Sequence, residues 1–381
     1  HFRLGRVAHD FPSSDLPDGM DDRIRRHARV LVDHCTDVGP EDDVEIRAPT
    51  AAEDLVVALY EALGRRGARP TTVWRNPRAT RAYAREMDPD DYRPKGHRVA
   101  ALAETDAVIL IKGARNAAET SDVDADTGRA ASRAKEPLLR ERLDTRWVIT
   151  QHPTPADAQR ADLSAAAWRS LVYDAVDRDW AAMRERQARV ADRLAAAEEV
   201  RVVAGDDTDL RFDVAGMEAY NDAGRENMPG GEVATVPTVD GVEGEVRFDH
   251  PLRRGGREAA GIRLSFAEGR VVDWAAERGA DVLDSLLGTD EGARRVGELG
   301  IGTNEGVDRV TGNVLFDEKA AGTVHVALGD ALSECVPDDR TGNESAVHAD
   351  LIRDASADAR IAFDGETVYR DGEFLIGNEG D

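Results

Sequence analysis

The sequence predicts a protein of two domains, a mainly parallel α/β domain over residues 1–205 and a β-rich α+β domain over residues 206–381. A chain of 381 residues is long enough to form two hydrophobic cores. In the first part, short apolar runs alternate with segments of helical periodicity, a pattern typical of βαβ units. After residue 200, short apolar runs are separated by Gly, Asp and Pro turns, which favours antiparallel strands.

In the first domain, apolar runs predict strands at Val44–Arg47, Thr71–Trp74, Val108–Lys112 and Trp147–Thr150. Helical spacing of apolar residues predicts helices over Asp22–Val38, from about Ala51 to Arg66 and over Ala165–Glu199. Thr50 is expected to cap the second of these helices. His152 begins a His-Pro-Thr-Pro segment whose prolines restrict the backbone, so we interpret it as a connector from strand to helix rather than as a catalytic group.

After residue 200, the short runs predict strands at Val200–Val203, Asp209–Val214, Val233–Val236, Gly244–Phe248, Gly261–Phe266 and Val271–Ala275. One helix is expected from Ala280 to Leu287, continuing towards Val296.

The charge balance is strongly acidic, with 75 Asp and Glu against 50 Lys and Arg and a formal net charge of -25. The basic residues are almost all arginine, and the lysines are Lys95, Lys112, Lys135 and Lys319. We interpret this composition as adaptation to a saline cytoplasm, where salt screens the repulsion between surface charges. A nucleic-acid partner is not expected, because phosphate binding needs clustered Lys and Arg.

The remaining bulk features predict a cytoplasmic protein without a membrane span. Cys35 and Cys335 are the only cysteines, so no disulfide framework and a reducing compartment are expected. No stretch approaches the roughly 18 apolar residues of a spanning helix. The first residues also lack the basic and apolar pattern of a secretory signal.

Candidate metal ligands are concentrated in the last third of the chain. His348 and Asp350 stand two residues apart in an apolar run, and in a strand they would point to the same side. Glu318 and His325 lie shortly before them. Each residue alone fits a surface ion pair or a buried histidine with satisfied nitrogens. Together, between strand-like runs, they favour a metal site.

Two further carboxylates stand in unusual settings. Glu232 follows a Pro-Gly-Gly turn at the head of an expected strand, and Glu298 lies between glycines that permit close approach of a ligand or another backbone. Alone, each of these glutamates fits an exposed surface residue. Added to the other four residues, they give a carboxylate-rich set with two histidines.

Carboxylate and imidazole ligands without thiolate suit zinc, manganese, cobalt or iron. Six candidates are too many for one tetrahedral ion, so we predict two divalent metal ions, with zinc, cobalt or manganese as the candidates. The ions would share a bridging carboxylate and a bridging water, roughly 3.5 to 4 Å apart, as in hydrolytic two-metal sites.

Several segments resemble the thermostable aminopeptidase T family of metallopeptidases. They are Arg146-Trp-Val-Ile-Thr-Gln-His-Pro-Thr-Pro, Asp209-Leu-Arg-Phe, Asn227-Met-Pro-Gly-Gly-Glu-Val, Gly297-Glu-Leu-Gly-Ile-Gly-Thr-Asn, Leu315-Phe-Asp-Glu-Lys, His325-Val-Ala-Leu-Gly and His348-Ala-Asp. The resemblance implies a two-domain, homodimeric exopeptidase with a peptide substrate and a dinuclear site in the second domain. It implies that the metal ligands are Glu232, Glu298, His325, His348 and Asp350. Glu318 matches a further acidic position, either a ligand or the general base.

One position departs from the family pattern. A tyrosine thought to assist the reaction often follows the His-x-Ala-Leu-Gly segment, and Leu332 stands at the matching position. The leading hypothesis is a metal-dependent aminopeptidase with Glu318 as the catalytic base. One alternative is a mononuclear iron(II) ring-cleaving dioxygenase that uses His325, His348 and Asp350. The other alternative is a catalytically inactive relative.

Overall fold

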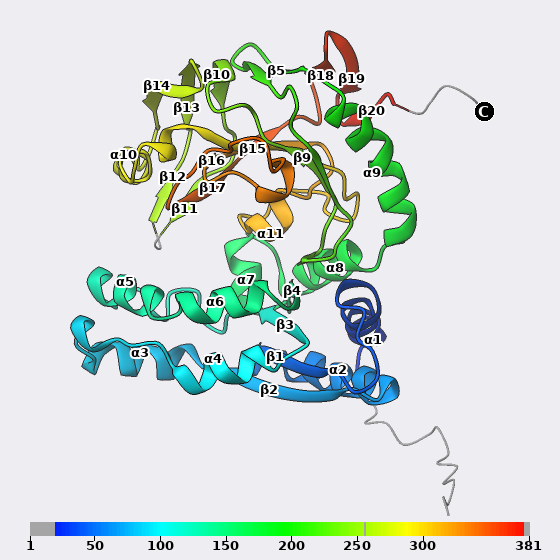
Figure 1. Cartoon of the computed structure of the whole chain (residues 1–381), viewed down its shortest axis with the longest axis vertical. Helices are drawn as coiled ribbons and strands as arrows, with labels where there is room; N and C mark the ends of the chain where they lie inside the picture. Colours follow the sequence, from blue (N-terminus) through cyan, green and yellow to red (C-terminus); the bar gives the residue numbers. More distant parts are fainter. Residues whose placement is uncertain (1–19, 255–256, 377–381) are drawn as a thin grey trace, which may run out of the picture.

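The computed structural model describes residues 20–254 and 257–376. Figure 1 shows a parallel sheet with its helices in the lower part and two antiparallel sheets in the upper part. We call these parts the α/β half and the β half. The fold class predicted from the sequence is confirmed.

The sheet of the α/β half has five strands in the order β2-β1-β3-β4-β8, and all neighbours are parallel. Its strands are β1 (Asp43–Pro49), β2 (Arg69–Arg75), β3 (Ala107–Lys112), β4 (Arg146–Gln151) and β8 (Asn227–Met228). The helices before β4 are α1 (Asp22–Arg29, continued by a π turn at Val30–Cys35), α2 (Glu53–Arg66), α3 (Pro77–Glu86), α4 (Gly96–Ala103), α5 (Ala125–Arg133) and α6 (Glu136–Leu143). The helices after β4 are α7 (Pro155–Arg160), α8 (Ala165–Val176) and α9 (Trp180–Ala195), of which α9 runs along the β half (Figure 1).

The β half contains an eight-stranded sheet in the order β14-β13-β10-β6-β5-β18-β19-β20 and a five-stranded sheet in the order β17-β16-β15-β9-β7. The first sheet comprises β5 (Glu199–Ala204), β6 (Asp209–Asp213), β10 (Val242–Arg247), β13 (Arg263–Ala267), β14 (Arg270–Ala275), β18 (Ala359–Phe363), β19 (Glu366–Arg370) and β20 (Glu373–Phe374). The second comprises β7 (Ala219–Asp222), β9 (Glu232–Thr235), β15 (Val296–Gly302), β16 (Thr323–Gly329) and β17 (His348–Asp354). The remaining elements are the hairpin β11 (Leu252–Arg254) and β12 (Arg257–Ala259) and the helices α10 (Ala280–Leu287) and α11 (Val314–Asp317).

The two sheets of the β half share one hydrophobic core, which includes Phe212 of β6 and Leu299 of β15. The parallel sheet has a separate core with its own helices. Strand β5 already belongs to the β half, whereas β8 returns to the parallel sheet. The division of the chain at residue 205 stays a prediction.

Three helix boundaries differ from the expected ones. Thr50 does not cap α2 but begins a 3-10 turn, and Ala52 occupies the N-cap without a side-chain hydrogen bond. The helical stretch 165–199 divides into α8 and α9, and the Asp179 side chain caps α9. Helix α10 ends at Leu287 instead of continuing towards Val296, since Gly288 follows and glycine disfavours the helix interior. His152 connects β4 to α7, as predicted.

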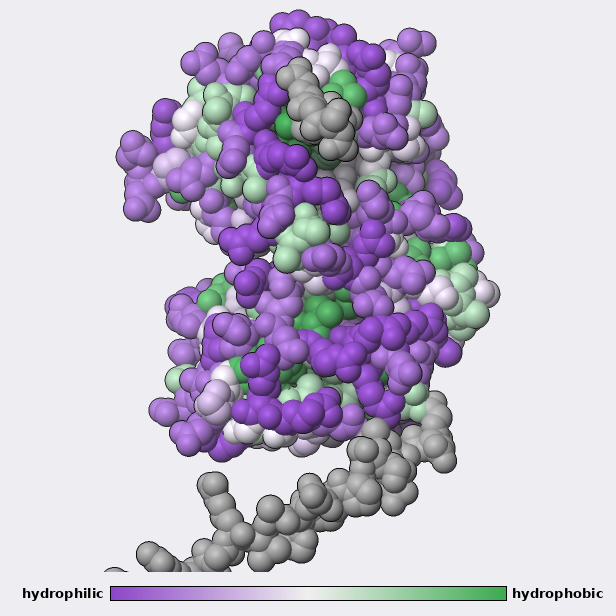
Figure 2. Space-filling view, turned by 90° about the vertical axis from the view of Figure 1, so that its right-hand side faces the viewer, coloured by the Kyte–Doolittle hydropathy of each residue, from purple (hydrophilic) through white to green (hydrophobic). Residues whose placement is uncertain are grey.

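Two features bear on the expected location. Both cysteines are buried and free. Across the described ranges 20–254 and 257–376, we find no helix with the length and hydropathy needed to cross a bilayer. Figure 2 shows a mostly hydrophilic face, in keeping with the acidic composition.

A buried histidine in the α/β half should make the stability of the fold depend on pH under acidic conditions. His27 is 1% exposed and its Nε2 lies 2.8 Å from Oγ1 of Thr150. Burial lowers the pKa of His27 to about 3, from 6.5. Below pH ~6.5, the unfolded chain binds a proton that the folded chain excludes. The free energy of unfolding should therefore fall by up to about 1.4 kcal/mol per pH unit until the folded pKa is reached.

We expect His27→Gln to reduce this acid-dependent loss, because glutamine does not titrate. Urea unfolding of both proteins at pH 7 and pH 5 measures the difference, and equal losses would contradict the prediction.

Candidate metal centre

The five-stranded sheet gathers five of the six predicted ligands on one face, all except Glu318. In its antiparallel register Glu232 is opposite Gly302, Gly300 is opposite His325 and Ala327 is opposite Asp350. Side chains alternate along a strand, so Leu299 and Ile301 of β15 enter the core while Glu298 points to the other side. Strand periodicity therefore brings together residues that lie far apart in the sequence.

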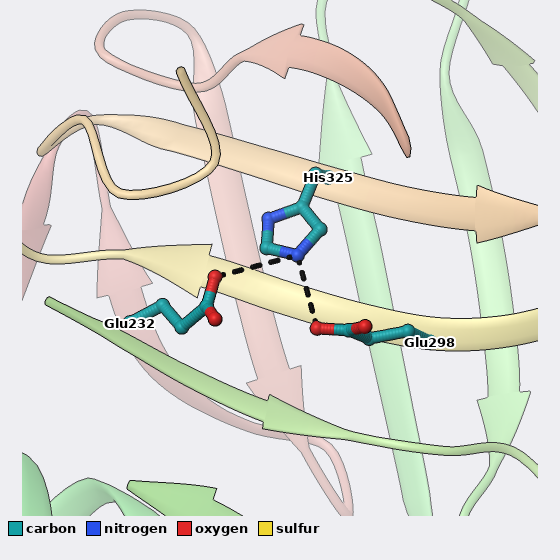
Figure 3. Close-up of side chains that lie close together, drawn as sticks. All are labelled: Glu232, Glu298 and His325. Atoms are coloured by element: carbon teal, nitrogen blue, oxygen red, sulfur yellow. Dashed lines mark hydrogen bonds and ion pairs between the residues drawn. The ribbon is translucent and has the colours of Figure 1, made fainter. Parts of the chain in front are cut away.

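The first candidate ligand group consists of Glu232, Glu298 and His325, from the neighbouring strands β9, β15 and β16 (Figure 3). The Nε2 atom of His325 lies 3.2 Å from Oε1 of Glu298 and 3.5 Å from Oε2 of Glu232. Their exposed fractions are 5% for each glutamate and 1% for the histidine. These three side chains converge in a place that is closed to bulk water.

The second candidate ligand group consists of Glu298, His348 and Asp350. The Nε2 atom of His348 lies 3.3 Å from Oε2 of Glu298 and 3.4 Å from Oδ1 of Asp350. On its other side, Nδ1 of His348 donates to the carbonyl oxygen of Asp330 at 2.8 Å. This bond fixes the tautomer and leaves Nε2 as the ligand atom. The His348 side chain is 36% exposed, so this group is accessible from outside.

Glu298 belongs to both groups. Its Oε1 faces His325 and its Oε2 faces His348. A carboxylate that offers one oxygen to each of two ligand groups has the arrangement of a bridging ligand.

Lys319 is a residue of the centre that the sequence analysis missed. It is 1% exposed, and its Nζ lies 2.9 Å from Oε1 of Glu318 and 3.2 Å from Oδ2 of Asp222. It also donates a hydrogen bond to Oε1 of Glu232. Glu318, directly after α11, lies outside both ligand groups and is joined to Glu232 through this lysine.

Asp222 was also missed. Its place in the centre follows from the pairing of two strands and not from a sequence motif. In β7 it is directly opposite Glu232 of β9, where two like charges would repel without a cation between them. For Lys319, a signal was present in the composition, because lysine is rare in this arginine-rich chain.

The electrostatics of the centre show an excess of buried negative charge. The carboxylates in or beside the two groups are Glu232, Glu298, Glu318, Asp350 and Asp222, and the lysine among them is Lys319. Burial raises the pKa of Glu232 to about 8 although Lys319 opposes this shift. Burial likewise raises the pKa of Glu318 against the effect of Lys319.

The histidines show the complementary effect. Burial alone would lower the pKa of His325, but the hydrogen bond to Glu298 raises it to about 9. For His348, burial is similarly outweighed by Asp350 and Glu298, which raise the pKa to about 11. Burial also acts on Glu298, but hydrogen bonds from the two histidines hold the pKa of its carboxyl below the ordinary value.

The residues present fit divalent cations. Carboxylate oxygens and imidazole nitrogens are the donors that zinc, cobalt and manganese accept. Oε2 of Glu232 is buried and forms no hydrogen bond with the described part of the chain. A cation between these groups would satisfy this oxygen and offset the excess negative charge.

Gly300 makes room for the imidazole of His325. A Cβ atom at residue 300 would lie 2.0 Å from Cε1 of His325. Gly300→Ala should therefore turn the ring away from its two glutamates and lower metal affinity by at least about tenfold, as when a ligand loses its support. Gly64→Ala is the control, since a Cβ there meets nothing within 4 Å. Zinc titration of both variants measures the effect, and wild-type affinity in Gly300→Ala would contradict the assignment.

Leu332 lies next to the centre. Its backbone N–H donates to the carbonyl oxygen of Gly297 at 3.1 Å, and its side chain packs against Met217, Val236 and Cys335. Tyr220 of β7 packs against the same cluster. A phenol is therefore present on this side of the sheet, on another strand.

A cavity of about 720 Å³ opens beside the second ligand group and lies between the two halves. His348 and Asp350 contribute to its β-half wall. The opposite wall includes Arg75, Lys112 and Gln151, which end the parallel strands β2, β3 and β4. Ligand sites of open α/β sheets lie at this carboxyl edge.

Comparison with known proteins places these features in a family. Residues 20–374 match the family described as thermophilic metalloprotease (M29). Aminopeptidase 2 of Geobacillus stearothermophilus is 30% identical over 93% of this chain and 98% of its own length. The structure of wild-type AmpT from Thermus thermophilus matches with a TM-score of 0.82 and 24% identity over 93% of this chain and 99% of that one.

A second solved structure shares the fold. The 2,5-dihydroxypyridine dioxygenase of Pseudomonas putida matches with a TM-score of 0.60 and 15% identity over 93% of this chain and 98% of that one. At this low sequence identity, the match indicates a shared fold and nothing about function. The match to the family over nearly all described residues, together with the full-length relative, shows that the chain belongs to the M29 family of thermophilic metalloproteases.

Proposed function

We propose that this protein is a metal-dependent aminopeptidase that removes residues from the amino terminus of peptides at a centre of two divalent ions. The observation that carries the proposal is the position of Glu298, which belongs to both ligand groups and offers one oxygen to each. Family membership supports hydrolysis of peptides, and the full-length relative is named an aminopeptidase.

Each residue has a role in this proposal. Glu232 and His325 would hold one ion, His348 and Asp350 would hold the other, and Glu298 would offer one oxygen to each. The bound ions would polarise the scissile carbonyl and lower the pKa of a water molecule towards neutrality. Glu318 is the candidate base that takes the proton of the attacking water and gives it to the leaving amine. Lys319 orients Glu318 by its contact at 2.9 Å.

A mononuclear iron(II) dioxygenase is the second candidate, because the fold is shared with a protein named as a dioxygenase. His325, His348 and Asp350 have the ligand types of such a site. The buried Glu232 and Glu298 argue against it, since both belong to the candidate ligand groups and an iron held by His325, His348 and Asp350 would use neither.

Metal analysis and hydrolysis separate these candidates. We expect about two ions per chain, and hydrolysis of leucine anilide that is stimulated by cobalt, manganese or zinc. One iron per chain with oxygen consumption and no hydrolysis would establish the dioxygenase. Absence of bound metal and of turnover would indicate an inactive relative.

We also propose that the protein is a homodimer from a saline cytoplasm. The acidic composition supports the salt adaptation, and the family resemblance supports the dimer. Activity and sedimentation velocity measured from low to high salt test both proposals.

A further inference from the structure

The cavity beside the centre has an unusual charge for this chain. Although the formal net charge is -25, its lining includes five cationic side chains. They are Arg75, Lys112, Arg160, Arg253 and Arg254. An acidic protein that gathers cations around a cavity next to its metal centre offers that cavity to an anion.

Three of these cations are not paired with a carboxylate of the described residues. Arg253 lies 3.2 Å from Glu258, and Arg160 lies 3.9 Å from Asp157. In contrast, Arg75, Lys112 and Arg254 form no ion pair with any residue in the described ranges. Arg75 and Lys112 stand at the carboxyl ends of β2 and β3, which flank β1 in the parallel sheet, where the cavity meets the α/β half.

The surroundings of Arg75 and Lys112 favour an anionic ligand. Arg75 and Lys112 are exposed, but the cavity walls partly desolvate them. This desolvation lowers the pKa of Lys112, an effect that Glu318 opposes and Arg75 reinforces. It also lowers the pKa of Arg75. A carboxylate between them would offset both the loss of hydration and the repulsion between two cations.

We propose that Lys112 and Arg75 bind the α-carboxylate of a short peptide whose amino-terminal residue lies at the metal centre. The cavity provides the geometry, because His348 and Asp350 line one wall and the two cations line the other. Its volume of about 720 Å³ falls in the ~300–1,000 Å³ range of small-ligand pockets. This inference rests on the proposed aminopeptidase function and narrows its substrates to short peptides with a free carboxyl terminus.

The test compares the tripeptide Leu-Gly-Gly with its carboxyl-terminal amide, which differ in one negative charge and contain no acidic side chain. For the wild-type protein, kcat/KM should be at least about tenfold higher for the free acid, which corresponds to ~1.4 kcal/mol. In Lys112→Met this ratio should fall towards one, and Lys112→Arg should restore part of it because the charge is kept.

Arg189→Gln is the matched control, because Arg189 lies exposed on α9 and outside the cavity. It should leave the ratio at the wild-type value. The cavity cations are exposed side chains, so the ratio should fall as added salt screens their attraction for the carboxylate.

Two results would overturn the inference. One is equal kcat/KM for acid and amide in the wild-type protein that hydrolyses both, an outcome that leaves the aminopeptidase function standing. The other is an acid-to-amide ratio of kcat/KM in Lys112→Met that equals the wild-type ratio. If neither peptide is hydrolysed, the proposed function fails, and calorimetric binding of the two peptides decides the inference. Tighter binding of the acid that depends on Lys112 supports the anion site, and equal binding refutes it.

Discussion

Replacing Glu298 with glutamine is expected to remove both metal ions and to lower kcat/KM by at least about a thousandfold, the scale of losing a main charge-stabilising group. The two oxygens of Glu298 face different histidines at 3.2 and 3.3 Å. An amide keeps one acceptor oxygen and places a donor where the second oxygen stood, so it cannot serve two cations.

Variants that alter only one of the two ligand groups show whether the loss of both ions is specific to Glu298. Glu232→Gln and Asp350→Asn each alter one ligand group, so each should retain about one ion per chain. Glu185→Gln, an exposed position on α9, is the control and should retain both. Elemental analysis after dialysis gives the counts, and circular dichroism checks the fold. If Glu298→Gln retained two ions, the assignment of Glu298 as the bridging ligand would be wrong.

Replacing Lys319 with methionine is expected to destabilise the metal-free protein by about 3–5 kcal/mol at neutral pH, the usual cost of removing one partner of a buried ion pair. Its ammonium group contacts Glu232, Glu318 and Asp222, and both Lys319 and Asp222 are 1% exposed. Methionine has a similar shape but no charge, so the three carboxylates would remain buried without their cation.

Saturating zinc should reduce this loss, because bound cations would replace part of the missing positive charge and binding to the folded state adds stability. Lys135→Met is the control, since Lys135 is exposed. Urea unfolding with and without zinc measures each protein. If Lys319→Met is insoluble, Lys319→Arg provides a second variant, which should fold but lose stability because the guanidinium does not fit the same closed site. Wild-type stability in both variants would contradict the role of Lys319.

Local sequence patterns were sufficient to predict much of the fold and of the candidate site. The apolar runs of β1, β3 and β4 are short and bounded by polar residues, and they were located to within a few residues. The two-residue spacing of His348 and Asp350 placed them on one side of β17, and both approach Glu298. These successes rest on the twofold periodicity of a strand, which acts within a few residues.

Other features depend on how distant segments meet. Asp222 became informative only when the register of β7 and β9 placed it opposite Glu232. Arg75 and Lys112 could be recognised as candidate ligand-binding residues only because the β half lies across from them and completes the cavity. The end of α10 at Leu287 was misjudged although a signal was present, because the polar, two-glycine segment 288–292 follows the helix before the chain enters β15.

The short path from β8 to Glu232 links the two halves mechanically. Strand β8 ends at Met228 at the edge of the parallel sheet, and Glu232 begins β9 after Pro229, Gly230 and Gly231. The fully buried Asn304 holds this segment by donating to the carbonyl oxygens of Gly230 at 2.8 Å and Ala175 at 3.0 Å. A hinge motion that opened the cavity would pull on this short tether and shift a ligand carboxylate, so cavity opening and metal retention would be coupled.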